Sequence, residues 1–128
     1  MGHNPGLTQA FTASGAIPAR SFVKFGADDD TVTIAGVGDD AIGVTTEIDA
    51  ADGETVDVHL GGVVEVIFGG NVGRGKLLAS GANGQAIQAA PADNTTVSTA
   101  GRAMCSGVAG DIGLVLLGPG SLTAVAAV

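Results

Sequence analysis

The chain lacks tryptophan and tyrosine, and it has only four phenylalanines and one cysteine among 128 residues. Without large rings, Val, Ile, Leu and Ala must fill the core, which favours thin sheets packed closely with glycine at the bends. The missing rings also count against a sugar-stacking surface. Cys105 has no second thiol for a disulfide, zinc or redox pair, so we expect it to act as a small buried apolar residue.

Basic residues are also scarce, because five Lys and Arg stand against thirteen Asp and Glu, for a net charge of −8. Binding of DNA or RNA needs a basic face, so neither nucleic acid nor an anionic membrane surface is an expected partner. No segment approaches the roughly 18 apolar residues that span a bilayer. Residues 1–15 lack the basic start and apolar run of a signal peptide. These absences favour a soluble protein made in the cytoplasm.

What the chain has is glycine, 22 residues without a collagen period, between short alternating runs. In Thr55–Leu60, for example, Val56, Val58 and Leu60 face one way, which leaves His59 on the polar, exposed face. No helical stretch with caps emerges. We therefore predict an all-β fold, a small barrel or sandwich of short antiparallel strands. The other predicted strands are 22–25, 31–34, 41–46, 63–68, 76–79, 85–90, 102–106 and 112–117.

Three regions follow from this pattern. Residues 1–15 are predicted to form an extended N-terminal arm, 16–117 the β domain, and 118–128 an apolar C-terminal tail without charge. The tail should pack back on the domain or against a neighbour, because a monomer seldom leaves such residues in water. Within the domain, Gly61-Gly62 between two β-rich runs predicts a two-residue hairpin.

The pattern of small residues occurs twice in the chain. An offset of 55 aligns Phe22 with Leu77 and Val32 with Ile87, and by the end an offset of 57 aligns Gly53 with Gly110. Two similar halves of a pseudo-symmetric barrel would explain the recurrence. Chance recurrence in a chain rich in Gly, Ala and Val would explain it as well.

Residues that could carry chemistry are few. Gly70–Lys76 has the spacing of a phosphate-binding loop, but Leu77 stands where Ser or Thr should hold magnesium, and no helix follows. The acidic clusters lack the alternating ligands of a calcium loop and are typical of solvated turns. No nucleophile elbow is present. We therefore predict no catalytic, cofactor-binding or metal-binding residues, and no enzyme. The clusters are 28–30, 39–40 and 49–54.

The order and spacing of these turns resemble the capsid decoration, or cement, proteins of tailed bacteriophages. The resemblance covers about residues 16–117 and depends on several short motifs together. They are Ile17-Pro18-Ala19-Arg20, Ile42-Gly43-Val44, Ala51–Val58, Gly73–Leu77, Gly84-Gln85-Ala86, Gly101-Arg102-Ala103 and Ala109-Gly110-Asp111.

The resemblance implies a structural protein on the outer surface of a virion, synthesised in the host cytoplasm. Its partner would be the major capsid protein, whose subunit contacts it would stabilise, and it would form a homo-oligomer, with a trimer favoured. A receptor- or glycan-binding module of a virion fibre or cell surface is the alternative. A third reading is a carrier domain with a cofactor on Lys24 or Lys76.

Overall fold

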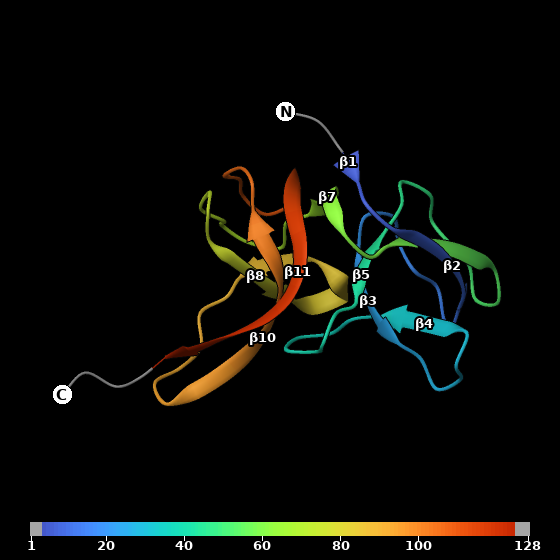
Figure 1. Cartoon of the computed structure of the whole chain (residues 1–128), viewed down its shortest axis with the longest axis horizontal. Coiled ribbons are helices and arrows are strands. Elements are labelled where there is room, and N and C mark those ends of the chain that lie inside the picture. The colour runs from blue at the N-terminus through green and yellow to red at the C-terminus, as the bar shows by residue number, and fades with distance from the viewer. Residues whose placement is uncertain (1–3, 125–128) are drawn as a thin grey trace.

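The computed structural model describes residues 4–124 and confirms the all-β prediction, with eleven strands in that range and one short 3₁₀ turn, η1 (Ala82–Gly84). The strands form two bodies side by side along the long axis of the molecule (Figure 1). They are β1 (Asn4–Pro5), β2 (Thr8–Ala13), β3 (Phe22–Phe25), β4 (Thr31–Ile34), β5 (Gly43–Thr45), β6 (Thr55–His59), β7 (Gly62–Ile67), β8 (Leu77–Ser80), β9 (Ala86–Gln88), β10 (Thr95–Ala103) and β11 (Ile112–Ala124).

The first body is a closed barrel, named barrel 1 here, with the strand order β2-β4-β3-β5-β6. All of its pairings are antiparallel except the one between β2 and β4, which is parallel. The apolar residues of the alternating runs point inward, so that Val32 and Val58 have no exposed surface. The barrel closes because β2 pairs with β6 on one edge and with β4 on the other.

The second body is a six-stranded sheet with the order β1-β7-β11-β10-β8-β9. A parallel bridge between Phe68 and Ala86 joins the end of β7 to β9, where barrel 1 has its parallel β2–β4 pair. The strands from β7 to β11 therefore curl into a second barrel-like body, named barrel 2 here.

The two bodies share one topology, in agreement with the sequence repeat. The isolated bridge Ile17–Ala50 in barrel 1 recurs as Val72–Gly107 in barrel 2, at offsets of 55 and 57. Gly53 and Gly110, also 57 apart, both have positive φ, 84° and 90°. Hydrogen-bonded turns thus recur at the offsets that the sequence alignment gave, which favours a true structural repeat over chance.

The interiors of the two barrels are filled in different ways. Ala13 of barrel 1 corresponds to Phe68 of barrel 2, and both are buried. The extra ring volume is offset at Gly113, because a Cβ there would overlap the Phe68 ring. Val56 occupies the position in barrel 1 that Gly113 occupies in barrel 2, as the β2–β6 and β7–β11 registers show.

Barrel 1 also contributes to the core of barrel 2. Phe22, Ala35 and Val44 have no exposed surface and belong to the hydrophobic cluster that contains Phe68 and Leu78, although they lie on strands and loops of barrel 1. A separate cluster that includes Ile17 fills barrel 1. The interface between the barrels is therefore apolar and continuous with one of the two cores.

The Gly61-Gly62 hairpin prediction is wrong. Strand β6 pairs with β2 and β5, whereas β7 pairs with β1 and β11, so the two glycines carry the chain from barrel 1 into barrel 2. Gly62 still uses its conformational freedom, with a φ of 83°. The dipeptide indicated a sharp change of direction correctly but not which strands would pair.

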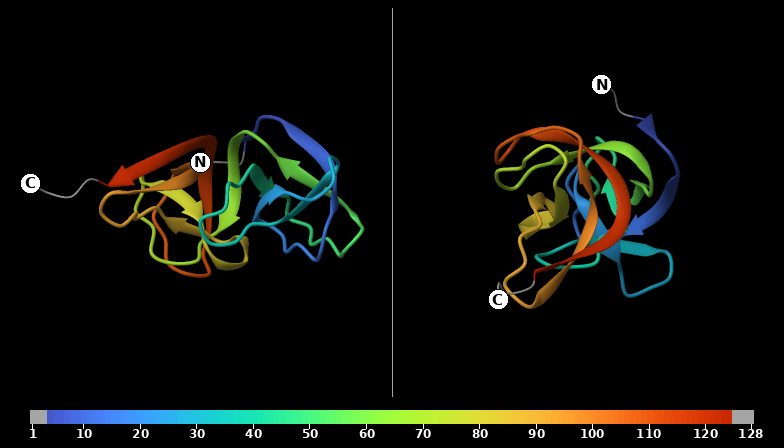
Figure 2. Two further views of the ribbon diagram at one scale, coloured as in Figure 1. Left: turned by 90° about the horizontal axis from the view of Figure 1, so that it is seen from below. Right: turned by 60° about the vertical axis from the view of Figure 1, so that its left-hand side comes forward.

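Parts of the predicted arm and tail lie in strands. Residues 8–13 form β2 inside barrel 1, so this part of the predicted arm belongs to the β domain. Residues 118–124 continue β11 (red in Figure 1; curved in Figure 2), and Val125 and Val128 lie outside the described residues. The division into arm, domain and tail otherwise remains a prediction.

Candidate functional site

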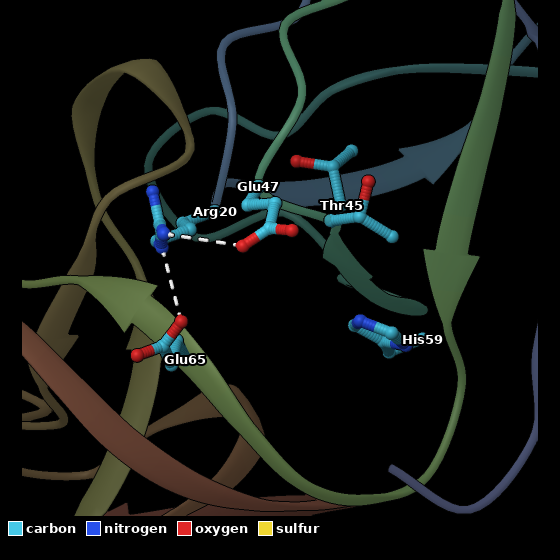
Figure 3. Close-up of a pocket in the computed structure, with 6 residues that line it drawn as sticks. Arg20, Thr45, Glu47, His59 and Glu65 are labelled. Atoms are coloured by element: carbon cyan, nitrogen blue, oxygen red, sulfur yellow. Dashed lines mark hydrogen bonds and ion pairs between the residues drawn. The ribbon is translucent and has the colours of Figure 1, made fainter. Parts of the chain in front are cut away.

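Six polar or charged side chains line a pocket at the junction of the two barrels (Figure 3). Its volume is about 310 Å³, and strands of both barrels contribute to its wall. The lining residues are Arg20, Thr45, Thr46, Glu47, His59 and Glu65.

Arg20 joins the two sides of this junction pocket. Its Nε donates to Glu65 Oε1 of β7 at 3.2 Å, and its Nη2 lies 3.8 Å from Glu47 Oε2. Its backbone carbonyl accepts from Ile67 N at 3.1 Å, which adds a main-chain bond across the junction. Arg20 has a left-handed φ of 54°, a conformation that costs a non-glycine residue about 1 kcal/mol or more. Arg20 therefore links the two barrels through its side chain and its backbone, and we call these contacts the Arg20 latch.

His59 is buried, which corrects the prediction of an exposed side chain. Only 8% of its surface is exposed, and its Nδ1 lies 2.8 Å from Thr8 Oγ1. The alternation along β6 assigned the face correctly. That face is covered at its end because His59 pairs with Thr8 of β2 on one side and Val44 of β5 on the other.

The hydroxyl of Thr45, one of two threonines that line the junction pocket, is hydrogen-bonded to the main chain. Thr45 Oγ1 donates to Pro18 O at 3.0 Å and accepts from Ser21 N at 3.1 Å. Arg20 donates to Glu65 and forms an ion pair with Glu47, and both contacts stabilise the junction of the barrels. Cys105 is partly buried against the core, where Leu114 N donates to its Sγ at 3.4 Å.

The acidic clusters behave largely as turn-forming residues. Asp49 accepts from Ala19 N at 2.7 Å, and Asp52 accepts from Gly15 N at 2.8 Å. Glu54 closes its own turn by accepting from Ala51 N at 2.6 Å. Within residues 4–124, no group of three His, Cys, Asp or Glu side chains could hold a metal ion.

Lys24 and Asp39 form a third ion pair, at 2.8 Å. The hydrogen bond from Lys24 and a second from Gly36 N lower the pKa of the Asp39 carboxyl below its ordinary value of 3.8. Lys24, one of the two lysines that a carrier domain could modify, thus forms an ion pair at the surface.

The Gly70–Lys76 segment is a loop between β7 and β8, as expected, and is followed by a strand. Gly73 N donates to Gln88 Oε1 at 3.0 Å and Arg74 N donates to Ser106 Oγ at 3.0 Å. Two amide groups that a phosphate-binding loop would need are therefore occupied. No helix in the described chain is long and apolar enough to cross a bilayer.

Two surface features remain as candidates for binding a macromolecule. A groove of about 540 Å³ runs between barrel 1 and the place where β10 and β11 leave barrel 2. Beyond it, residues 95–99 of β10 pair with residues 120–124 of β11 as a two-stranded extension, named the ribbon here. Sequence reasoning missed the N-terminal half of β10, although Thr95–Thr99 is rich in β-branched residues. The groove is lined by Phe25, Asp40, Ala41, Ile42, Leu60, Ser98, Thr99, Ala100, Leu117, Gly118, Pro119 and Gly120.

Comparison with known proteins agrees with a structural role. Residues 2–117 match the model of a family described as phage cement protein. No curated protein matches the chain. Among solved structures, the N base of head fibre gp8.5 of bacteriophage phi29 is similar in fold, with a TM-score of 0.69 and 18% sequence identity, over 88% of this chain and 93% of that one. The chain belongs to the phage cement protein family, which is structural, capsid-associated and not enzymatic.

Proposed function

We propose that this protein binds the outer surface of a phage head and stabilises the contacts between neighbouring major capsid subunits. Family membership supports an association with the capsid. The observation that supports binding to the capsid surface is the ribbon, because its strand edges are available to pair with another protein.

The ribbon has unpaired edges and no charge. Among the residues that the structure describes, residues 120–123 pair with β10 alone and residues 95–99 pair with β11 alone. Ala124 also bridges Asp93, just before β10. A two-stranded ribbon is marginally stable in water, and soluble proteins usually protect such edges with charges or bulges. Here Thr95–Thr99 and Gly118–Ala124 contain no charged side chain, and only a bulge near Thr99 and Pro119 interrupt them.

The same feature suits repeated weak binding. An uncharged edge can add to a strand of a partner through main-chain hydrogen bonds, with affinity that is modest for one copy. We further propose that copies act as a homo-oligomer, with a trimer favoured, because linked copies raise occupancy without any strong single contact.

The test is to incubate the purified protein with undecorated heads and to reconstruct the particles by cryo-electron microscopy. The wild-type protein should give ordered density on the outer surface. The double variant Val97→Lys with Leu122→Lys should lose that density, because the pair faces each other across the ribbon and lysine disfavours edge pairing.

Val108→Lys is the matched control, because Val108 is an exposed apolar residue in a turn of barrel 2 away from the ribbon. Thermal melting should show that both barrels stay folded in all variants, although two facing lysines weaken the ribbon itself. Absence of wild-type density on the shell would contradict the proposed function, and full binding by the double variant would exclude the ribbon as the contact.

A further inference from the structure

The charge of the molecule is divided unequally between the barrels. Residues 1–61, which include barrel 1, carry ten acidic and two basic residues, a net charge of −8. Residues 62–128 carry three of each and are neutral. The whole net charge therefore resides on one half of an elongated molecule, whose two halves lie at opposite ends of the long axis (Figure 1).

The three basic residues of barrel 2 lie together on one face. Arg74 and Lys76 are in the loop before β8, and Arg102 on β10 donates from Nη1 to Gly75 O of that loop at 2.6 Å. All three side chains are exposed, and within residues 4–124 none of them forms an ion pair. We name Arg74, Lys76, Leu77 and Arg102 the basic face.

The basic face of barrel 2 corresponds, in the repeat, to the surface of barrel 1 that packs against barrel 2. In barrel 1, Phe22 pairs with Val44, and in barrel 2, Leu77 pairs with Arg102. Phe22 and Val44 are completely buried against barrel 2. The equivalent positions of barrel 2 have no barrel to cover them, and Arg102 is exposed.

Inside the molecule, a turn of barrel 2 fills this face of barrel 1. Gly84 of η1 packs so closely that a Cβ on it would lie 2.7 Å from Phe22 O and 3.0 Å from Ser21 Cβ. The counterpart of η1 in barrel 1 is the five-residue loop between β3 and β4, in which Asp29 takes the place of Gly84. The counterpart of Ser21 is Lys76.

Asp29 has a side chain where Gly84 leaves no room for one, so a contact of this kind between two molecules would be looser than the internal one. It would still bring opposite charges together. The loop that would approach the basic face contains Asp28, Asp29 and Asp30, which are all exposed. Their backbones form the turn, through Asp28 O with Thr31 and Asp30 O with Thr12 N, while no side-chain contact of the three carboxylates is among the hydrogen bonds and ion pairs of residues 4–124. Asp29 corresponds to Gly84 and Lys76 to Ser21 in the repeat, so the loop supplies carboxylates and the basic face supplies cations.

We propose that the basic face of barrel 2 binds the Asp28–Asp30 loop of barrel 1 of a second copy of this chain, head to tail. Such a contact joins two different surfaces, so it closes into a ring or continues as an array, according to the rotation between copies. Each pair of exposed charges contributes little and is screened by salt, so the contact is weak and favoured at low ionic strength. The proposal does not rest on the proposed capsid function.

Charge reversal tests the contact. Self-association is measured by sedimentation velocity over a range of protein concentrations, in low and in high salt. The wild-type protein should associate at low salt and dissociate as salt is raised. Lys76→Glu or Asp29→Lys alone should weaken association roughly tenfold, because each converts attraction to repulsion at the contact.

The double variant, Lys76→Glu with Asp29→Lys, should recover association close to that of the wild type, since the pair is complementary again. Asp57→Lys is the control for net charge, because Asp57 is exposed on β6 outside the loop, and it should leave association intact. Thermal melting confirms that each variant folds. A wild-type protein that stays monomeric at low salt, or a double variant no better than the single ones, would overturn the proposal.

Discussion

At the scale of single residues, the two barrels show how one topology accepts two different cores. Barrel 2 accommodates Phe68 only because Gly113 has no side chain, whereas barrel 1 combines Ala13 with Val56. Interiors are close-packed, so a gain of volume at one position requires a loss at its neighbour. The sequence alignment of the repeat shows both substitutions, but only the structure shows that they touch.

This pairing predicts a compensation between two variants. Gly113→Val should destabilise the protein by about 1–3 kcal/mol through overpacking, and Phe68→Ala should cost about 3–5 kcal/mol by leaving a cavity. The double variant should cost clearly less than the two changes together, because it reproduces the combination found in barrel 1. Equilibrium unfolding in denaturant measures all three. Additive losses would show that the two positions are independent.

The Asp39 carboxyl gives a prediction on pH. Its pKa is lowered in the folded protein by Lys24 and by Gly36 N, so its contribution to stability is present above the ordinary value of 3.8 and is lost as the pH falls through the folded pKa. Asp39→Asn should therefore be less stable than the wild type at neutral pH. The difference should shrink as the solution is acidified below the ordinary value. Melting temperatures across a pH series check this, and a constant difference would contradict it.

At the scale of elements, strand boundaries were largely readable from alternation, while strand partners were not. Thr31–Ile34 and Phe22–Phe25 form strands with the predicted bounds. Gly61-Gly62 failed as a hairpin because both edges of β6 are occupied by β2 and β5. The segment Thr8–Ala13 has little apolar alternation, so its sequence does not indicate a strand, yet as β2 it closes barrel 1.

Two N-terminal deletions therefore should have different effects. Removal of residues 1–6 leaves β2 in place, and the fold should persist with a small loss of stability. Removal of residues 1–13 takes away the strand that closes barrel 1, so the thermal transition should fall steeply or disappear. Circular dichroism melts of the two truncated proteins distinguish these outcomes. A stable fold after the longer deletion would show that β2 is dispensable.

At the scale of the whole molecule, the barrels are two repeats but share an apolar interface. Because Phe22 and Val44 are completely buried in the cluster of barrel 2, neither barrel keeps its native environment if the other unfolds. The latch from Arg20 to Glu65 adds a polar contact at the edge of the same interface. The two barrels are therefore expected to behave as one cooperative unit.

Calorimetry tests this coupling. The wild-type protein should unfold in one transition, with a calorimetric enthalpy equal to the van't Hoff enthalpy. Phe22→Ala should cost about 3–5 kcal/mol and lower the melting temperature of the whole molecule, even though residue 22 lies on barrel 1. Two separate wild-type transitions would show that the barrels unfold independently.

The sequence by itself determined the all-β class, the positions of many strands and the family resemblance, because each depends on local alternation, turn residues and their spacing. It also suggested the repeat, which the structure then supported. Only the tertiary structure decided the burial of His59, the passage of Gly61-Gly62 between barrels, the Arg20 latch and the position of the basic face. These depend on hydrogen-bond ladders and packing between residues far apart in the chain, which alternation along one strand does not specify.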